Sequence, residues 1–171
     1  MLAPEPVMST PFAELVREHQ SMVFSIAYHF LRDRTVAEEI AQDVFLKLFR
    51  NLDSLESPAH VTFWLRRVTV HRAVDYARKR QRRPEIALED TAELRDRHET
   101  GDPMLNRRLQ ALVQSLPEKP RSVMILRYQE DLMPEEIARI LDMPVRTVKS
   151  HLHRSLAMLR EKMERSMGGS R

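Results

Sequence analysis

The sequence predicts an all-α protein made of two small helical domains joined by a flexible linker. Only three of the 171 residues are glycine, and long stretches repeat apolar residues about every 3.6 positions, as a helix requires. No segment alternates apolar and polar residues strictly enough to predict a strand. The periodicity stops near residue 81 and resumes near residue 104. We therefore expect domains over residues 8–82 and 104–166, with a linker over residues 83–103.

Three helices are expected in the first domain. The first covers Phe12–Leu31, and the second covers Val36–Phe49. The segment Thr35–Glu38 has the spacing of a capping box, in which a hydroxyl and a carboxylate satisfy free N–H groups at a helix start. The Asn, Asp, Ser and Pro content of Asn51–His60 predicts a loop. A third helix is expected from about Val61 to Arg80.

The second domain is expected to end in a helix-turn-helix. Helices over Leu105–Ser115 and Arg121–Glu130 precede Pro134–Leu152, which has the apolar spacing of two short helices across a turn. Its apolar positions are Ile137, Ala138, Leu141, Met143, Val148 and Leu152. Asp142 occupies the turn position that often takes a left-handed backbone, and Pro144 restarts the chain as a helix that continues to about residue 165. An ordinary helical hairpin with a solvated basic face is the alternative.

The second helix of this pair would present a polar and basic face. Its members are Arg146, Thr147, Lys149, Ser150, His153 and Arg154. Such a face of hydrogen-bond donors and positive charge suits the DNA major groove. We expect the two residues at the helix start to contact phosphate and the other four to contact base edges or backbone. His151 lies beside this face, and the pattern leaves its role open.

A second basic surface is expected on the third helix. Residues 66–83 contain eight Arg and Lys against one acid, whereas residues 85–102 contain seven acids against two Arg. A basic block of this kind indicates a polyanion partner. The candidate DNA contacts are Arg66, Arg67, His71, Arg72, Asp75, Arg78, Lys79 and Arg80. A solvated charge run is the alternative for residues 78–83, and Trp64 is expected in the core rather than stacked on a base.

The composition argues against several classes of protein. Without cysteine, the chain forms no disulfide, thiolate zinc site or cysteine nucleophile, which fits a reducing cytoplasm. No apolar run reaches the length of a membrane span, so we expect no membrane insertion. His151 and His153 stand two residues apart and do not share a helical face. We expect neither a catalytic centre nor a cofactor.

Three segments, in this order, resemble a bacterial RNA polymerase sigma factor of the extracytoplasmic-function (ECF) group of the sigma-70 family. AEEIAQDVFLKLFR resembles the polymerase-binding helix of region two, and FWLRRVTVHRAVDYARKRQRR resembles its promoter-melting, −10-reading helix. LPEKPRSVMILRYQEDLMPEEIARILDMPVRTVKSHLHRSLAMLR resembles region four, which reads the −35 element. The resemblance runs from about residue 12 to residue 163 and includes the loop 51–60, which builds a pocket for a flipped base in this family.

The resemblance implies partners and sites. The partners are core RNA polymerase, through its β′ clamp and β subunits, promoter DNA and an anti-sigma factor. The polymerase-binding residues it implies are Glu39, Gln42, Asp43, Phe45 and Leu46. The alternative for Glu38 and Glu39 is a solvated acidic turn favoured by the helix dipole. His71 stands where the family often has Asn, and Asp142 stands where it usually has Gly.

Two other functions compete with this interpretation. A stand-alone helix-turn-helix repressor or activator would bind a palindrome as a dimer and need no polymerase. A nucleic-acid enzyme with a basic helical domain would need an acid/base or metal cluster, and the sequence offers none.

Overall fold

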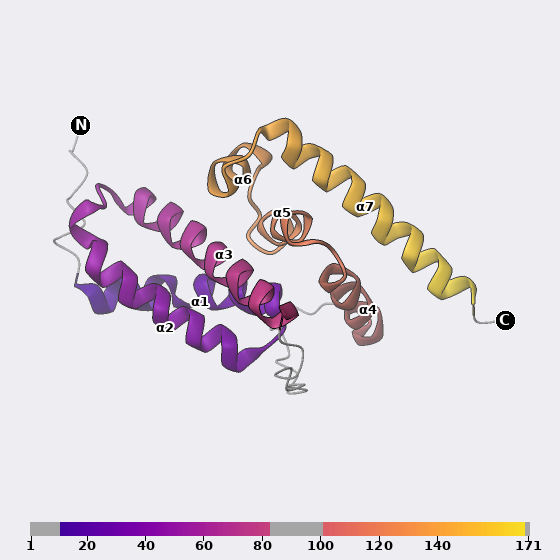
Figure 1. The fold of residues 1–171 in the computed structure, drawn as a ribbon, viewed down its shortest axis with the longest axis horizontal. Coiled ribbons are helices and arrows are strands. Elements are labelled where there is room, and N and C mark those ends of the chain that lie inside the picture. The colour runs from indigo at the N-terminus through magenta and orange to yellow at the C-terminus, as the bar shows by residue number, and fades with distance from the viewer. Residues whose placement is uncertain (1–10, 83–100, 170–171) are drawn as a thin grey trace. The chain divides into compact units, whose positions relative to one another are not determined.

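The computed structural model describes residues 11–82 and 101–169, and every regular element in these ranges is a helix (Figure 1). This confirms the all-α prediction. The chain divides into two compact units, residues 1–90 and 91–171. The predicted linker over residues 83–103 lies almost entirely outside the described residues. No described helix is both long and apolar enough to span a membrane.

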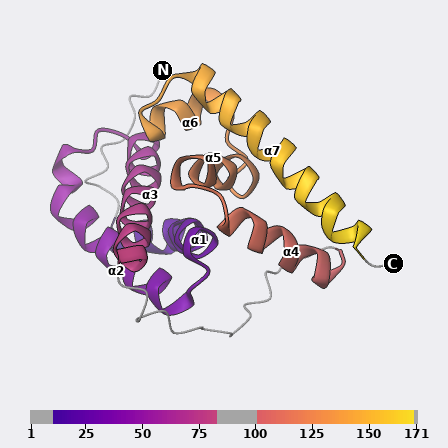
Figure 2. The ribbon, with the colours of Figure 1, turned by 45° about the vertical axis from the view of Figure 1, so that its right-hand side comes forward.

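The first unit is built from three helices that all contact one another. They are α1 (Phe12–Leu31), α2 (Arg34–Asn51) and α3 (Pro58–Arg82), with a short 3-10 turn, η2 (Leu52–Ser54), after α2. Helix α1 packs against both α2 and α3, and two residues connect it to α2 (Figure 2). The largest fully buried side chains are Val23, Ile26, Phe30, Val44, Leu48, Val61 and Leu65. The apolar stripes expected on the first two helices therefore meet in one core.

The cap of α2 is Asp33, so the predicted capping box at Thr35 is wrong. The Val36 N–H donates to Asp33 Oδ1 over 3.1 Å, whereas Thr35 is exposed inside the helix. Asp and Thr both cap helices, but the earlier start places Val36 in the first turn, where it is buried. Just before it, Arg32 takes a left-handed conformation with φ 53° and ends α1.

The segment expected to be a loop, Asn51–His60, is helical at both ends. The turn η2 continues from α2, and α3 begins at Pro58. The His60 N–H donates to Ser57 Oγ over 3.1 Å, which makes Ser57 a helix cap with a proline directly after it. Ser-Pro therefore marks a helix start here, three residues before the one predicted.

The second unit contains α4 (Pro103–Gln114), α5 (Glu118–Tyr128), α6 (Pro134–Leu141) and α7 (Val145–Gly168). Helices α4, α5 and α6 all contact α7. Asp102 Oδ1 accepts from the Met104 N–H over 3.0 Å, so α4 starts two residues before the predicted boundary. Helix α5 also starts earlier than predicted, and α7 runs three residues beyond residue 165. Three residues separate α4 from α5, and three separate α6 from α7.

The turn of the helix-turn-helix has the left-handed residue that the sequence predicts. Asp142 lies at φ 51° and ψ 53°, and the Met143 N–H donates back to Ala138 O over 3.1 Å. This conformation is strained for a residue with a Cβ, although Asp tolerates it better than most. The Asp142 carboxylate also lies at the negative end of the α6 dipole, where a negative charge is unfavourable.

Replacing Asp142 by glycine is expected to stabilise the second unit by about 0.5–1 kcal/mol, because it removes both the strain and the charge. The measurement is urea unfolding followed by circular dichroism. Asp142→Ala is the matched control, since it removes the charge and keeps the Cβ. An alanine variant as stable as the glycine variant would show that backbone strain contributes nothing at this turn.

Candidate nucleic-acid interface

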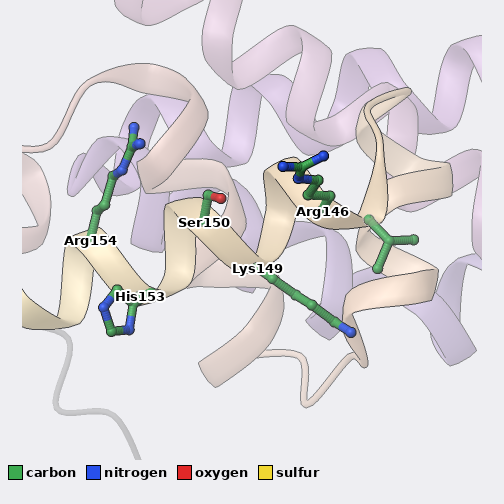
Figure 3. A pocket seen from close by; sticks show the side chains of 6 residues that line it. Arg146, Lys149, Ser150, His153 and Arg154 are labelled. Carbon is green, nitrogen blue, oxygen red and sulfur yellow. The ribbon is translucent and has the colours of Figure 1, made fainter.

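The outward face of α7 gathers five of its six predicted DNA contacts. Arg146, Lys149, Ser150, His153 and Arg154 line a shallow hollow together with Val145. Figure 3 shows Arg146, Ser150 and Arg154 rising along one side of the helix, while Lys149 and His153 follow the other side. All five are exposed. Two arginines, a lysine, a hydroxyl and an imidazole therefore share one continuous surface, which we call the α7 face.

The opposite side of α7 is held in the core, which fixes the direction of the α7 face. Val148, Ser155 and Leu159 are buried there. The sixth predicted contact, Thr147, is half-buried and does not line the hollow. It lies in the first turn of α7, where its backbone N–H donates to Pro144 O over 2.9 Å. Thr147 therefore lies beside the α7 face rather than on it.

The edge of the α7 face next to α5 carries a cation that the sequence analysis missed. His151 is half-buried, and its pKa is lowered first by burial and then by the charges of Arg154 and Lys119. Lys119 belongs to the first turn of α5, 32 positions before His151 in the chain. Helical spacing relates residues within one helix only, so no sequence pattern connects these two.

Helix α3 presents a second polar stripe. Arg67, His71, Asp75 and Arg78 recur at intervals of three and four residues, so they lie along one side of the helix. Burial lowers the pKa of His71, as do the charges of Arg67 and Lys47, while Asp75 opposes the shift. His71 therefore favours the neutral imidazole, which can both donate and accept a hydrogen bond.

Three further predicted residues of α3 lie around this stripe. Arg72 and Lys79 are exposed, and Arg80 is half-buried near the helix end. Lys47 comes from α2, where it is exposed. Its charge also lowers the pKa of His71, after the larger effects of burial and Arg67.

Arg66, which the sequence analysis placed among the DNA contacts, is half-buried and lies off this stripe. Burial lowers the pKa of His19 on α1, Glu18 opposes this shift from 4.0 Å, and the charge of Arg66 lowers the pKa further. The Arg66 Nε is buried and has no hydrogen-bond partner among the described residues. One residue turns a helix by about 100°, and this rotates Arg66 from the side of Arg67 towards α1.

Trp64 is also placed differently from its prediction as a core residue. It is half-buried, as is Phe63, whereas the fully buried positions of α3 are Val61, Leu65, Thr69, Val70 and Ala73. Thr69 enters the core because its hydroxyl donates to Leu65 O over 2.6 Å within the helix. The indole of Trp64 is therefore partly accessible on α3 itself, three residues before Arg67 of the polar stripe.

Helix α2 carries an exposed face of mixed character, which we call the α2 face. Glu39, Gln42 and Asp43 are exposed on it, and Leu46 beside them is 57% exposed. Phe45 is only 8% exposed and faces the core, so its prediction as a polymerase contact is wrong. Helical rotation by about 100° separates it from Leu46.

Phe49 extends the α2 face and was missed by the sequence analysis. It is 61% exposed, and its ring meets that of Phe12 edge-to-face with centroids 5.2 Å apart. It lies seven residues after Gln42 and three after Leu46, so helical spacing alone could have found it. The face therefore has an apolar end at Leu46 and Phe49 and a polar end at Glu39.

No group of three or more His, Asp or Glu side chains in the described part of the chain is arranged to hold a metal ion. The three surfaces described above are exposed faces of single helices with neighbouring additions. Such surfaces suit binding to large partners.

Comparison with known proteins identifies two family regions in this chain. Residues 15–83 match the family Sigma-70 region 2, and residues 106–159 match Sigma-70, region 4. The chain is 31% identical over 166 residues to the ECF RNA polymerase sigma-E factor of Escherichia coli, covering 90% of this chain and 86% of the relative. It is 33% identical over 157 residues to the ECF RNA polymerase sigma factor SigE of Mycolicibacterium smegmatis, covering 86% and 60%.

A solved structure has the same fold. The sigma factor RpoE, in complex with the anti-sigma factor NepR from Bartonella quintana, superposes with a TM-score of 0.73 at 20% identity, covering 90% of this chain and 96% of that one. The two family matches occur in the order that the sequence predicts, and relatives above 30% identity are covered over most of their length. The chain therefore belongs to the extracytoplasmic-function group of the sigma-70 family of RNA polymerase sigma factors.

Proposed function

We propose that this sigma factor holds its promoter at two points and core polymerase at a third. Sigma factors of this family bind core RNA polymerase and direct it to promoters, and this chain does the same. The proposal concerns which surface does what: the α7 face reads the −35 element, the polar stripe of α3 binds the −10 element, and the α2 face docks on the β′ clamp coiled coil. The α7 face is the observation that carries it.

The α7 face has the chemistry for duplex DNA. Arg and Lys side chains donate to guanine O6 and N7 in the major groove, and Ser and His add shorter donors or acceptors. Arg146, at the helix start, is suited to a phosphate. Because Val148 and Leu159 anchor the other side in the core, the whole row enters a groove as one rigid unit.

The α3 stripe has the chemistry for a separated strand. Arg67, Arg72 and Lys79 supply positive charge for a phosphate backbone. His71 and Asp75 offer hydrogen-bonding groups to unstacked bases, and Trp64 offers part of an aromatic surface for stacking. Opening a duplex needs tighter binding to the single strand than to the duplex, which this combination provides.

We also infer the place of action and a regulator. The protein works where the polymerase works, in the cytoplasm, and catalyses no reaction itself. Relatives of the same fold have been solved with the anti-sigma factor NepR and with the cytosolic domain of CnrY. We propose that this chain also has an anti-sigma partner.

Run-off transcription with core polymerase over a promoter library tests the function and identifies both promoter elements at once. We expect transcripts only when core polymerase and this protein are both present. A purified protein that protects a palindromic site alone, at moderate salt, would instead favour the stand-alone helix-turn-helix regulator.

Arg154→Ala tests the −35 assignment. We expect the holoenzyme to lose about tenfold in promoter affinity, because a base contact by Arg contributes about 1–3 kcal/mol, while core binding is unchanged. Arg165→Ala is the matched control, since Arg165 lies on the last turns of α7 and pairs with Glu161. Equal loss of core binding and promoter binding in Arg154→Ala would contradict the assignment.

A further inference from the structure

We propose that His19 makes the first unit an acid-sensitive switch, in which proton uptake by its imidazole loosens α1 from α2 and α3. This inference does not depend on which surface of the unit binds DNA or polymerase. It concerns the packing that supports the α2 face and the α3 stripe, because α1 packs against both of those helices.

His19 lies in an otherwise apolar stripe of α1. This stripe runs through Leu15, His19, Val23, Ile26 and Phe30, at intervals of three or four residues, so all five lie on one side of the helix. His19 is 8% exposed, and Leu15 and Val23 on either side of it are buried as well. The imidazole therefore takes part in the core packing of the three-helix unit.

A charged imidazole is poorly accommodated at this position. Moving a charge out of water is costly unless a partner compensates it, so burial favours the neutral form of His19. The Oε1 atom of Glu18 lies 4.0 Å from His19 Nε2, but the Glu18 side chain is 68% exposed. Water screens the attraction of such an exposed group, so Glu18 offsets only part of the cost of burial.

The other charged group that acts on His19 disfavours its protonation. Arg66 of α3 would face a second positive charge, and its own Nε is already buried without a hydrogen-bond partner among the described residues. Among the described residues, α2 contributes no charge that acts on His19. Burial has the largest effect, Glu18 opposes it and Arg66 adds to it, so the pKa of His19 is lowered.

A lowered pKa makes the folded unit sensitive to acid. In the unfolded chain His19 takes up a proton near its ordinary pKa of about 6.5, whereas in the folded unit it stays neutral to lower pH. Stability is therefore complete above about pH 7 and is lost as the pH falls below about 6.5. In this range the folding equilibrium constant of the first unit should fall by up to about tenfold per pH unit.

Urea unfolding of the full chain tests the switch. Between about pH 7.5 and about pH 5.5, the urea midpoint of the first unit should fall in the wild-type protein. His19→Leu, which makes the stripe apolar throughout, should remove the His19 part of this fall. Glu18→Gln should enlarge the fall, because it removes the charge that attracts a proton to His19. His71→Asn is the matched control and should keep most of the fall, since His71 is an exposed histidine of the same unit.

Nuclear magnetic resonance measures the proton uptake directly. The Cε1–H resonance of His19 in the folded wild-type protein should titrate below pH 6.5, and this measurement decides the question even if His19→Leu does not fold. Titration of His19 at its ordinary pKa in the folded protein would overturn the switch. An equal fall in the midpoints of wild type and His19→Leu would overturn it too, as would a fall that disappears in His71→Asn instead.

Transcription should follow the same order. Just below the temperature at which the first unit unfolds, acidification should reduce run-off transcription with core polymerase more for the wild type than for His19→Leu. Comparing the two proteins at each pH removes the effect of acid on the polymerase itself. Equal losses would show that proton uptake does not reach the binding surfaces, and the switch would then be wrong.

Discussion

Leu46→Asp is expected to lower the affinity for core polymerase about 100-fold, equivalent to about 2.7 kcal/mol. Leu46 is 57% exposed between the acidic and amide groups of the α2 face and the exposed ring of Phe49. Apolar side chains ringed by polar ones contribute most of the affinity of an interface, because their burial expels water. A carboxylate at this position would be desolvated without a partner. The change in affinity is measured by letting each unlabelled variant displace labelled wild-type protein from core polymerase.

Leu46→Met is the matched control and should bind core polymerase almost normally, because it retains the apolar surface. Because Leu46 is exposed, neither substitution should change the temperature at which the protein unfolds. If Leu46→Asp bound core polymerase normally, the α2 face would not be part of the polymerase interface.

Asp43→Asn should act differently from Leu46→Asp. It should slow the association of this protein with core polymerase and weaken the salt dependence of that rate, because charges at the rim of an interface chiefly steer the diffusional encounter.

Arg121→Ala is expected to cost the second unit about 2 kcal/mol in its free energy of unfolding. Arg121 Nη2 donates to Gln114 O and to Leu116 O, each over 2.9 Å, and its Nε donates to Leu116 O over 3.3 Å. These carbonyls lie at the end of α4, where helices leave acceptors unpaired. Burial lowers the pKa of the guanidinium, while Glu118 opposes the shift. Removing a charged donor from half-buried acceptors costs about 1.5–3 kcal/mol.

Differential scanning calorimetry of the full chain checks this prediction. The transition of the second unit should move down by roughly 10 °C, and that of the first unit should stay in place. Arg121→Lys should recover part of the loss, since one ammonium cannot reproduce the fork of the guanidinium. The exposed Arg160 provides a control, for which alanine should cost less than about 0.5 kcal/mol. A similarly small loss in Arg121→Ala would show that water replaces the guanidinium at these carbonyls.

The helices and the α7 face could be predicted because one short-range rule governs them. Helix α1 has the predicted bounds, and α7 buries Val148 while it exposes Lys149 and Arg154. In these helices the apolar and polar sides are clearly separated, so the periodicity fixes which residues face the core. The left-handed backbone conformation of Asp142 could also be predicted from local chemistry, because few residues other than Gly, Asn and Asp tolerate it.

The errors arise where tertiary packing chooses between locally equivalent options. Asp33 and Thr35 both cap helices, and the burial of Val36 decides between them. Phe45 and Phe49 are both aromatic residues near the end of α2, and only the positions of α1 and α3 determine which of them is buried. Arg66 appears in the sequence as part of a basic run, yet its Nε is buried and its charge acts on His19 of α1. Lys47 and Lys119 act electrostatically on His71 and His151 from other helices, and no single-helix pattern contains such pairs.

The connections of two or three residues between α1 and α2, α4 and α5, and α6 and α7 have a kinetic consequence. Closing such short loops costs little chain entropy, and most neighbours in each unit are also close in sequence. Helical domains of this low contact order fold in roughly microseconds to milliseconds. Residues appear at about 5–20 per second during synthesis, so the first unit can complete its folding before the second has left the ribosome.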